Sequence, residues 1–93
     1  MDDYSTWRWS RQFRDAVNMP DTATRLGRVI RRLRTERGIS QEGLAAISGV
    51  DRTFMGEIER GETNPSFDVL QRIAAGLTVR LSDLVRQYES ETD

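Results

Sequence analysis

Apolar residues recur along this chain at intervals of three and four, the spacing that brings them onto one face of a helix. The first long run carries Leu26, Ile30 and Leu33 among charged positions, and it predicts a helix over residues 22–37 that ends before Gly38. No stretch alternates apolar and polar residues convincingly, as a half-buried strand does. The pattern therefore predicts an all-α fold.

Two shorter helix patterns follow, joined by a tight break at Gly49. Ser40 and Asp51 each precede one of them, and their side-chain oxygens can accept hydrogen bonds from the free N–H groups of a first helical turn. Gly49 follows the first apolar run, where a positive φ lets the chain leave a helix at little cost. Gly61 closes the second pattern. Two helices joined by so short a turn predict a helix-turn-helix unit.

Two more helix patterns complete the array. Ser66 is placed to cap the first, which is expected to begin near Phe67, and Ser82 is placed to cap the second. We therefore expect five helices in a compact array over residues 22–88, followed by an acidic, polar tail at 89–93. The apolar positions of the last two helices are Leu70, Ile73, Ala74, Leu77, Leu84, Val85 and Tyr88.

The composition limits the size of the core and the cellular setting. Ninety-three residues, of which 37% are hydrophobic, allow one small domain whose stability is expected to depend on oligomerisation as well. The absence of Cys excludes disulfides and thiolate metal sites and suits a reducing compartment. No stretch is apolar enough to span a membrane, and the Asp-rich start does not read as a signal peptide. We expect a cytoplasmic protein.

The net charge of −1 is distributed unevenly along the chain. Residues 1–37 hold nine Arg against five acids, whereas residues 38–61 have a balance of −2 and residues 62–93 a balance of −3. A local basic patch matters more for phosphate binding than the total charge does. All fourteen cations are Arg, whose planar fork suits phosphate and guanine. Codon bias in a GC-rich genome is the alternative explanation for most of them.

The motifs of the chain carry a resemblance to a known family. The central segment reads SQ-x-x-LA-x-x-x-GV from Ser40, followed by M-x-x-IE-x-G from Met55. The segment before it reads L-G-x-x-IR-x-LR-x-x-x-G-IS from Leu26, and the one after it reads N-PS-x-x-x-L-x-x-IA from Asn64. Over about two thirds of its length the chain resembles the DNA-binding domain of the Cro and phage-repressor family, also called the xenobiotic-response-element family. The resemblance implies a repressor-type fold whose second helix-turn-helix helix lies in a DNA major groove.

The resemblance also implies particular contacts with double-stranded DNA. Four positions at and after the start of the recognition helix match base-contacting positions: Arg52, Thr53, Gly56 and Glu57. Four others match phosphate-contacting positions: Gln41, Arg60, Asn64 and Ser66. Arg34 and Glu59 match a structural ion pair of the family, and their spacing supports the pair, since each directly follows a core residue.

These features predict a sequence-specific transcriptional regulator that binds a palindromic operator as a homodimer. Its D-R-T-F-M-G-x-I-E-R-G segment, starting at Asp51, looks most like the controller proteins of restriction–modification systems, with phage-type repressors close behind. RNA polymerase is a further candidate partner. A different alternative is an antitoxin-type module that binds a protein toxin and regulates its own operon.

An apolar surface on the fifth helix is the candidate dimer interface. It is formed by Leu81, Leu84, Val85 and Tyr88. Catalysis has little support, because the chain has no His, Cys or Lys to act as a base or nucleophile. We therefore expect a protein that is not an enzyme and that needs no cofactor, metal or small-molecule ligand.

The N-terminal segment, residues 1–21, lies outside the family motifs. It interleaves Trp9 and Phe13 with arginines, and Pro20 marks its end. One interpretation is a short additional helix that packs on the core or on a partner subunit. The other is a basic arm that contacts DNA.

Overall fold

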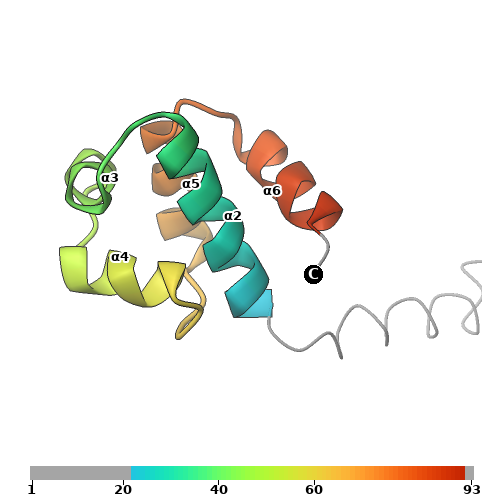
Figure 1. The fold of residues 1–93 in the computed structure, drawn as a ribbon, viewed down its shortest axis with the longest axis horizontal. Helices are drawn as coiled ribbons and strands as arrows, with labels where there is room; N and C mark the ends of the chain where they lie inside the picture. Colours follow the sequence, from blue (N-terminus) through green and yellow to red (C-terminus); the bar gives the residue numbers. More distant parts are fainter. Residues whose placement is uncertain (1–21, 92–93) are drawn as a thin grey trace, which may run out of the picture.

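A computed structural model of the protein describes residues 22–91, and within that range the chain is entirely helical apart from its connections. The predicted all-α fold is confirmed. The helices, labelled as in Figure 1, are α2 (Thr22–Glu36), α3 (Gln41–Ser48), α4 (Arg52–Glu59), α5 (Phe67–Gly76) and α6 (Leu81–Ser90). The interpretations of residues 1–21, as an extra helix or as an arm, lie outside the described residues.

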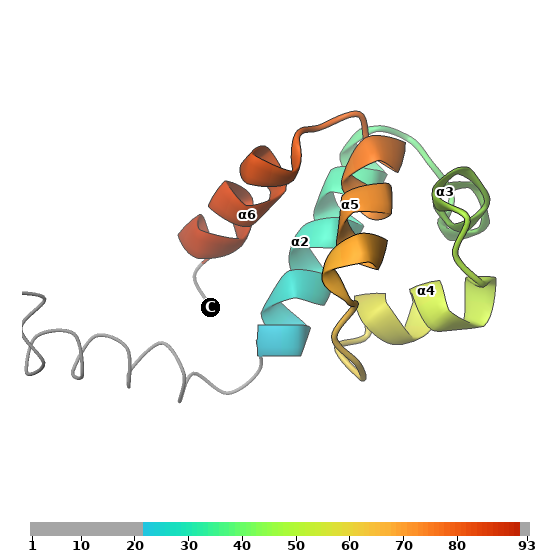
Figure 2. The ribbon, with the colours of Figure 1, turned by 180° about the vertical axis from the view of Figure 1, so that it is seen from behind.

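Helix α2 is the centre of the array. Helix α4 packs on one side of it and α6 on the other, and the same order is seen from behind (Figures 1 and 2). Helix α5 packs against both α3 and α6, and α3 packs against α4. The helix-turn-helix pair α3–α4 therefore lies at one end of the molecule, separated from α6 by α2 and α5.

One apolar core joins all five helices. The predicted core positions of α2 are buried, and Met55 and Ile58 of α4 are fully so. Val50, in the turn between α3 and α4, is buried in the same core. The largest fully buried side chains are Val29, Ile30, Leu44, Met55, Ile58, Ile73, Leu77 and Leu84.

Helices α3, α4 and α5 begin at the capping residues that the sequence predicted. The hydroxyl of Ser40 accepts a hydrogen bond from the Gly43 backbone N–H at 2.9 Å. One Asp51 carboxylate oxygen accepts from the backbone N–H groups of residues 53 and 54 at 3.0 and 3.3 Å. Ser66 likewise accepts from the N–H of Val69 at 3.1 Å. Each cap satisfies donors that would otherwise be unpaired in the first turn, and so fixes where its helix begins.

Gly27 sets the distance between α2 and α4. A Cβ atom at this position would lie 2.3 Å from the carbonyl oxygen of Ile58 and 2.7 Å from that of Glu59. Both are backbone atoms at the end of α4, so no side-chain rotation can relieve the contact. The absence of a side chain at Gly27 thus lets α4 pack directly against α2, and this contact was not predicted from the sequence.

The C-terminal helix differs from the prediction in three respects. It begins at Leu81, after Arg80, because the Asp83 carboxylate accepts from the backbone N–H of Arg80 at 3.4 Å; Ser82 is therefore not the cap. Leu84 is fully buried, so it belongs to the core rather than to an exposed dimer surface. The helix also continues to Ser90, into the region expected to be a tail.

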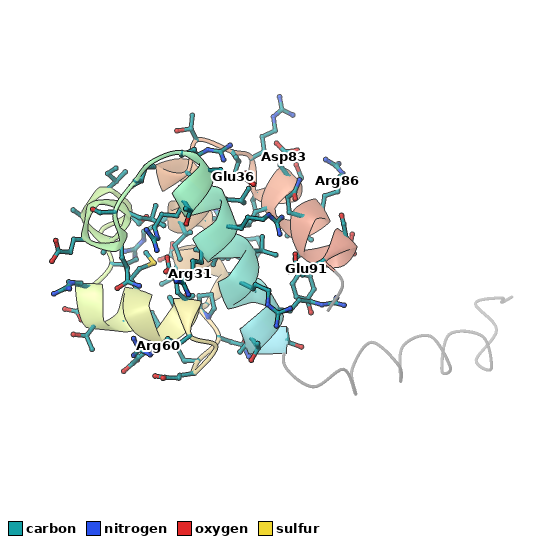
Figure 3. All side chains as sticks on the ribbon, in the orientation of Figure 1. Arg31, Glu36, Arg60, Asp83, Arg86 and Glu91 are labelled. Carbon is teal, nitrogen blue, oxygen red and sulfur yellow. The ribbon has the colours of Figure 1, made fainter. Side chains whose placement is uncertain are left out.

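The expected tail is held to the domain by its charge. The Glu91 carboxylate accepts a hydrogen bond from Arg32 of α2 at 2.6 Å and lies 3.7 Å from the Arg28 guanidinium. Figure 3 shows Glu91 beside the end of α6, facing α2. Opposite charges on elements far apart in sequence therefore extend the ordered domain beyond residue 88.

Candidate nucleic-acid interface

The helix-turn-helix unit consists of α3, a three-residue turn and α4. Gly49 has a φ of 67°, the left-handed conformation predicted for it, and its N–H reaches the carbonyl oxygens of Ala45 and Ala46. Phe54 is half-buried against the core, which leaves the opposite side of α4 for contacts outside the domain. The first residues of α4, Arg52 and Thr53, are exposed on that side.

Five of the eight predicted DNA-contacting residues line one open hollow of about 210 Å³. They are Gln41, Arg52, Thr53, Gly56 and Arg60. Gln41 comes from the first turn of α3, and the other four come from α4 and its C-cap. Residues up to 19 positions apart in the sequence thus form a single concave surface, which carries the guanidinium groups of Arg52 and Arg60. In Figure 3, Arg60 lies beside α4, across α2 from Glu91.

Gly56 has a different place in the hollow from the one expected. It is buried, because the side chains of Arg60 and Gln41 cover it. A Cβ atom at Gly56 would lie 3.0 Å from Arg60 Nη1 and 3.4 Å from Gln41 Oε1. The missing side chain therefore makes room for the Arg60 guanidinium, one helical turn further on, rather than presenting bare backbone to a ligand.

Both guanidinium groups of the hollow are paired with glutamates. Arg52 Nε lies 3.2 Å from Glu42 Oε2, and both side chains are about two-thirds exposed (67% and 65%). Arg60 donates from Nε and Nη2 to the two carboxylate oxygens of Glu62, at 2.8 and 3.2 Å. The hydrogen bonding from Arg60 holds the pKa of the Glu62 carboxyl below its ordinary value of 4.5. Glu62 is therefore ionised at neutral pH.

A buried carboxylate lies directly beneath this surface. Arg34 of α2 donates from Nε and Nη2 to the two oxygens of Glu59, at 2.7 and 3.0 Å, which is the bidentate geometry of a strong pair. Gln41 Nε2 donates to the same carboxylate at 3.0 Å, and Arg34 Nη1 donates to the carbonyl of Ile39 at 2.9 Å. Glu59 thus joins α2, the start of α3 and the end of α4, and fixes their relative positions.

The remaining predicted contact residues do not line the hollow. Glu57 is half-buried on α4, and Asn64 and Ser66 are exposed in the segment that leads to α5. Ser66 uses its hydroxyl to cap α5. Gln41 keeps one amide N–H beyond its bond to Glu59, so its donor capacity toward a phosphate is not exhausted.

A second, apolar hollow of about 230 Å³ lies on the opposite side of the domain. It is lined by Thr22, Leu26, Leu70, Leu84, Val85 and Tyr88. Leu84 forms its buried wall, while Val85 is 39% exposed at its rim. Tyr88 packs partly against the core, and its ring lies 5.2 Å from the Arg25 guanidinium. Of the residues predicted for a dimer interface, Val85 is the one most available to a second molecule.

The described residues offer no other obvious chemistry. No group of three or more acidic, His or Cys side chains in residues 22–91 is arranged to hold a metal ion. None of the helices in that range is both long and apolar enough to cross a membrane. The site does present the planar guanidinium groups of Arg52 and Arg60, the amide of Gln41 and the hydroxyl of Thr53. All of these groups can donate hydrogen bonds, and they suit phosphate and guanine oxygens.

A helix-turn-helix family model matches residues 30–84, which includes α3, α4 and the whole of α5. The chain belongs to the helix-turn-helix family. The matched range contains Arg34, Glu59 and every predicted DNA-contacting residue.

Among the relatives in this family are controller proteins. The chain is 40% identical over 74 residues to the control protein C.MunI of a Mycoplasma species, covering 78% of this chain and all of that protein. The crystal structure of the restriction-modification controller protein C.AhdI from Aeromonas hydrophila superimposes with a TM-score of 0.65 at 39% identity, covering 67% of this chain and 94% of that one. The predicted resemblance to restriction–modification controllers is confirmed.

Larger transcriptional regulators share the same domain. The chain is 41% identical over 68 residues to SlrR of Bacillus subtilis, an HTH-type transcriptional regulator, covering 72% of this chain but 43% of that protein. The chain thus spans less than half of SlrR and the full length of C.MunI. These relatives are regulators and controllers, and they lend no support to the antitoxin alternative.

Proposed function

We propose that this chain is a sequence-specific DNA-binding transcriptional regulator that acts as a homodimer on a palindromic operator, in the manner of a restriction–modification controller. The observation that carries the proposal is the hollow on α3 and α4. There, five residues predicted to contact DNA form one surface with two guanidinium groups. The match to the full length of a control protein, C.MunI, at 40% identity supports the same proposal.

Base reading is assigned to the start of α4. Arg52, exposed at the first position of the helix, donates two hydrogen bonds to the O6 and N7 atoms of a guanine, and the Thr53 methyl group meets a thymine methyl. Phosphate contacts are assigned to Gln41 and Arg60, at the two edges of the hollow. The bidentate pair of Arg34 and Glu59 holds α4 against α2 and thereby fixes the angle at which Arg52 is presented.

Two copies are needed because a single short recognition helix makes few base contacts. Palindromic half-sites about one helical turn apart double those contacts and account for tight binding. The dimer face is assigned to α6 and the apolar hollow beside it, with Val85 at the rim of the hollow and Leu81 and Tyr88 on the same helix. This face lies across the molecule from α4, so dimerisation leaves both DNA-binding surfaces free.

The test is a selection of duplex DNA from a random library by the full chain, followed by sedimentation of the selected complex. We expect enrichment of a two-fold symmetric sequence with half-sites about 10 base pairs apart, bound by two chains. The matched control is the double variant Arg52→Ala with Arg60→Ala. It keeps the fold, since both side chains are exposed, and should enrich nothing. The proposal is wrong if the wild-type chain also enriches no sequence.

A further inference from the structure

The apolar hollow beside α6 is left open by residues 22–91. Its volume is about 230 Å³, and its lining residues come from α2, α5 and α6. An apolar cavity of about 150 Å³ holds a benzene molecule, so this hollow has room for at least one aromatic ring. Ile47 and Phe67 are also exposed, but neither lines the hollow, and exposed apolar residues that stand singly need no partner. The hollow is therefore the apolar surface that calls for an occupant.

A two-fold contact between two copies does not by itself supply that occupant. In a symmetric contact centred on the hollow, a concave surface meets its own copy. Val85 is 39% exposed at the rim and can reach a second molecule, whereas Leu84 is fully buried in the wall. The space between the two copies then has to be filled by side chains from elsewhere in the chain.

The chain enters the described domain at the rim of this hollow. Thr22, the first residue of α2, is one of the lining residues, and Leu26 lies one turn further on. In Figure 1 the start of α2 lies at the same end of the molecule as the C-terminal half of α6, which carries Val85 and Tyr88. Residues 1–21 are thus tethered beside the hollow. A tethered segment has a much higher effective concentration at such a site than a separate molecule has.

The segment before Thr22 carries apolar side chains of the right kind. Four of the seven aromatic residues of the chain, both tryptophans included, lie within residues 1–21. Trp9, Phe13 and Val17 follow one another at intervals of four, which places them on one face of a helix, while Trp7 falls outside that face. The matched family model begins at residue 30, so the family domain does not include this segment.

We infer that residues 9–17 form an amphipathic helix that packs on α2 and α6 of the same chain, with Trp9 and Phe13 in the apolar hollow. Residues 18–21 then connect this helix to α2. Four residues, Pro20 among them, are a usual length for the loop between two antiparallel helices. The packing does not depend on the proposed function, but it extends that proposal, because the added helix becomes part of the dimer face together with Val85.

Tryptophan fluorescence tests the packing directly, because the chain after Trp9 contains no tryptophan. Trp7→Phe leaves Trp9 as the single reporter in the full chain, and Trp9→Phe leaves Trp7 as the matched control. Trp9 should emit at a shorter wavelength than in the denatured chain, and acrylamide should quench it severalfold less. Trp7 should behave in both respects as it does in the denatured chain. The protection of Trp9 should persist when the protein is diluted until it is monomeric, because its own chain supplies the hollow.

Substitutions on both sides of the contact identify the hollow as the site. In the dilute Trp7→Phe monomer, Val85→Asp places a carboxylate at the rim and should expose Trp9 to the quencher. Ile47→Asp makes the same kind of change at an exposed apolar residue of α3 and should have no effect. Phe13→Ala should lower the equilibrium constant for packing by about tenfold or more, the effect of losing one buried Phe side chain. This variant changes no residue of the described core, so unfolding of that core does not explain its result.

Three results overturn the inference. Trp9 is as accessible as in the denatured chain, or its protection disappears on dilution and therefore comes from the partner copy. In the third, the protection survives Val85→Asp or Phe13→Ala, and the segment packs elsewhere. None of these measurements uses DNA, so each of these results leaves the proposed DNA binding standing. A chain that selects no DNA sequence overturns the proposed function and not the packing of this segment.

Discussion

Replacing Glu59 with alanine tests the link between the core and the DNA-binding surface. The substitution removes a carboxylate whose side chain is 3% exposed and that accepts hydrogen bonds from Arg34 and Gln41. Arg34 is then left as a cation that is 15% exposed and that keeps its hydrogen bond to the Ile39 carbonyl. The stability lost on substitution therefore includes the cost of an unpaired buried charge as well as the loss of the hydrogen bonds themselves.

The size of the effect follows from this burial. Removing one partner of a buried ion pair costs about 3–5 kcal/mol, whereas exposed pairs are worth about 0–1 kcal/mol. Arg34 keeps its bond to Ile39 and remains partly accessible to water, so the expected loss is at the lower end of this range. Glu59→Ala should lower the free energy of unfolding by about 3 kcal/mol. For a domain of this size, that loss lowers the melting temperature by about 12–24 °C.

Denaturant and thermal melts of three variants measure this loss of stability. Arg34→Met with Glu59→Leu should recover much of the loss, because an apolar pair of similar volume leaves no charge unpaired. Glu62→Ala is the control for deleting an exposed partner, and its melting temperature should be almost unchanged. If Glu59→Ala melts like the wild type, the reasoning fails, and the helix angle is set by the apolar contacts of Leu33, Met55 and Ile58 alone.

Three further predictions use other features of the fold. Gly27→Ala should destabilise the domain by about 1–3 kcal/mol or more in a denaturant melt, because its Cβ would overlap the Ile58 carbonyl; unchanged stability would mean that α2 and α4 are not in such close contact. Val85→Asp should give a monomer in sedimentation, and an unchanged dimer would move the interface elsewhere, first to residues 1–21. Arg60→Gln should raise the pKa of the Glu62 carboxyl toward 4.5 in an NMR titration, since the lowering hydrogen bond is lost; a pKa that stays low would assign the shift to another group.

The helix-turn-helix unit was predictable because its signals are local. Ser40, Gly49 and Asp51 act within a few residues of their own positions, through capping and a positive φ, and the structure has them as predicted. The 3.6-residue period likewise identified the buried face of each helix without any knowledge of what it packs against. The predicted family followed from the same local motifs and is confirmed.

The features that sequence reasoning missed depend on distant parts of the chain. Gly27 reads as an ordinary weak point in a helix until the end of α4 is placed against it. Glu91 looked like part of a polar tail, but it is brought to Arg32, 59 positions earlier, by the packing of α6 on α2. The spacing of Leu84 in the sequence was compatible both with an exposed apolar surface and with the core. Its burial depends on how α6 is rotated against its neighbours, which the sequence does not show.

The pairing of Arg52 with Glu42 was also not foreseen. These residues lie on different helices of the unit, and their contact depends on the angle between α3 and α4 rather than on any sequence spacing. The signal available in the sequence was the excess of acids over arginines in residues 38–61, a segment assigned to DNA binding. The excess itself is balanced in another way, because Glu59 pairs with Arg34 from outside the segment and Asp51 caps α4.

The central claim, that α4 reads bases through Arg52, is tested most directly by a cycle that combines protein and DNA substitutions. Wild-type protein and Arg52→Ala are each titrated onto the selected operator and onto operators with single guanine substitutions, and Gln41→Ala serves as the control for a phosphate contact. We predict that Arg52→Ala loses about 1–3 kcal/mol on the operator, and that one guanine substitution affects the wild type but not the variant. Gln41→Ala should weaken binding to all sequences evenly. Equal losses for Arg52→Ala on operator and random DNA would contradict the account.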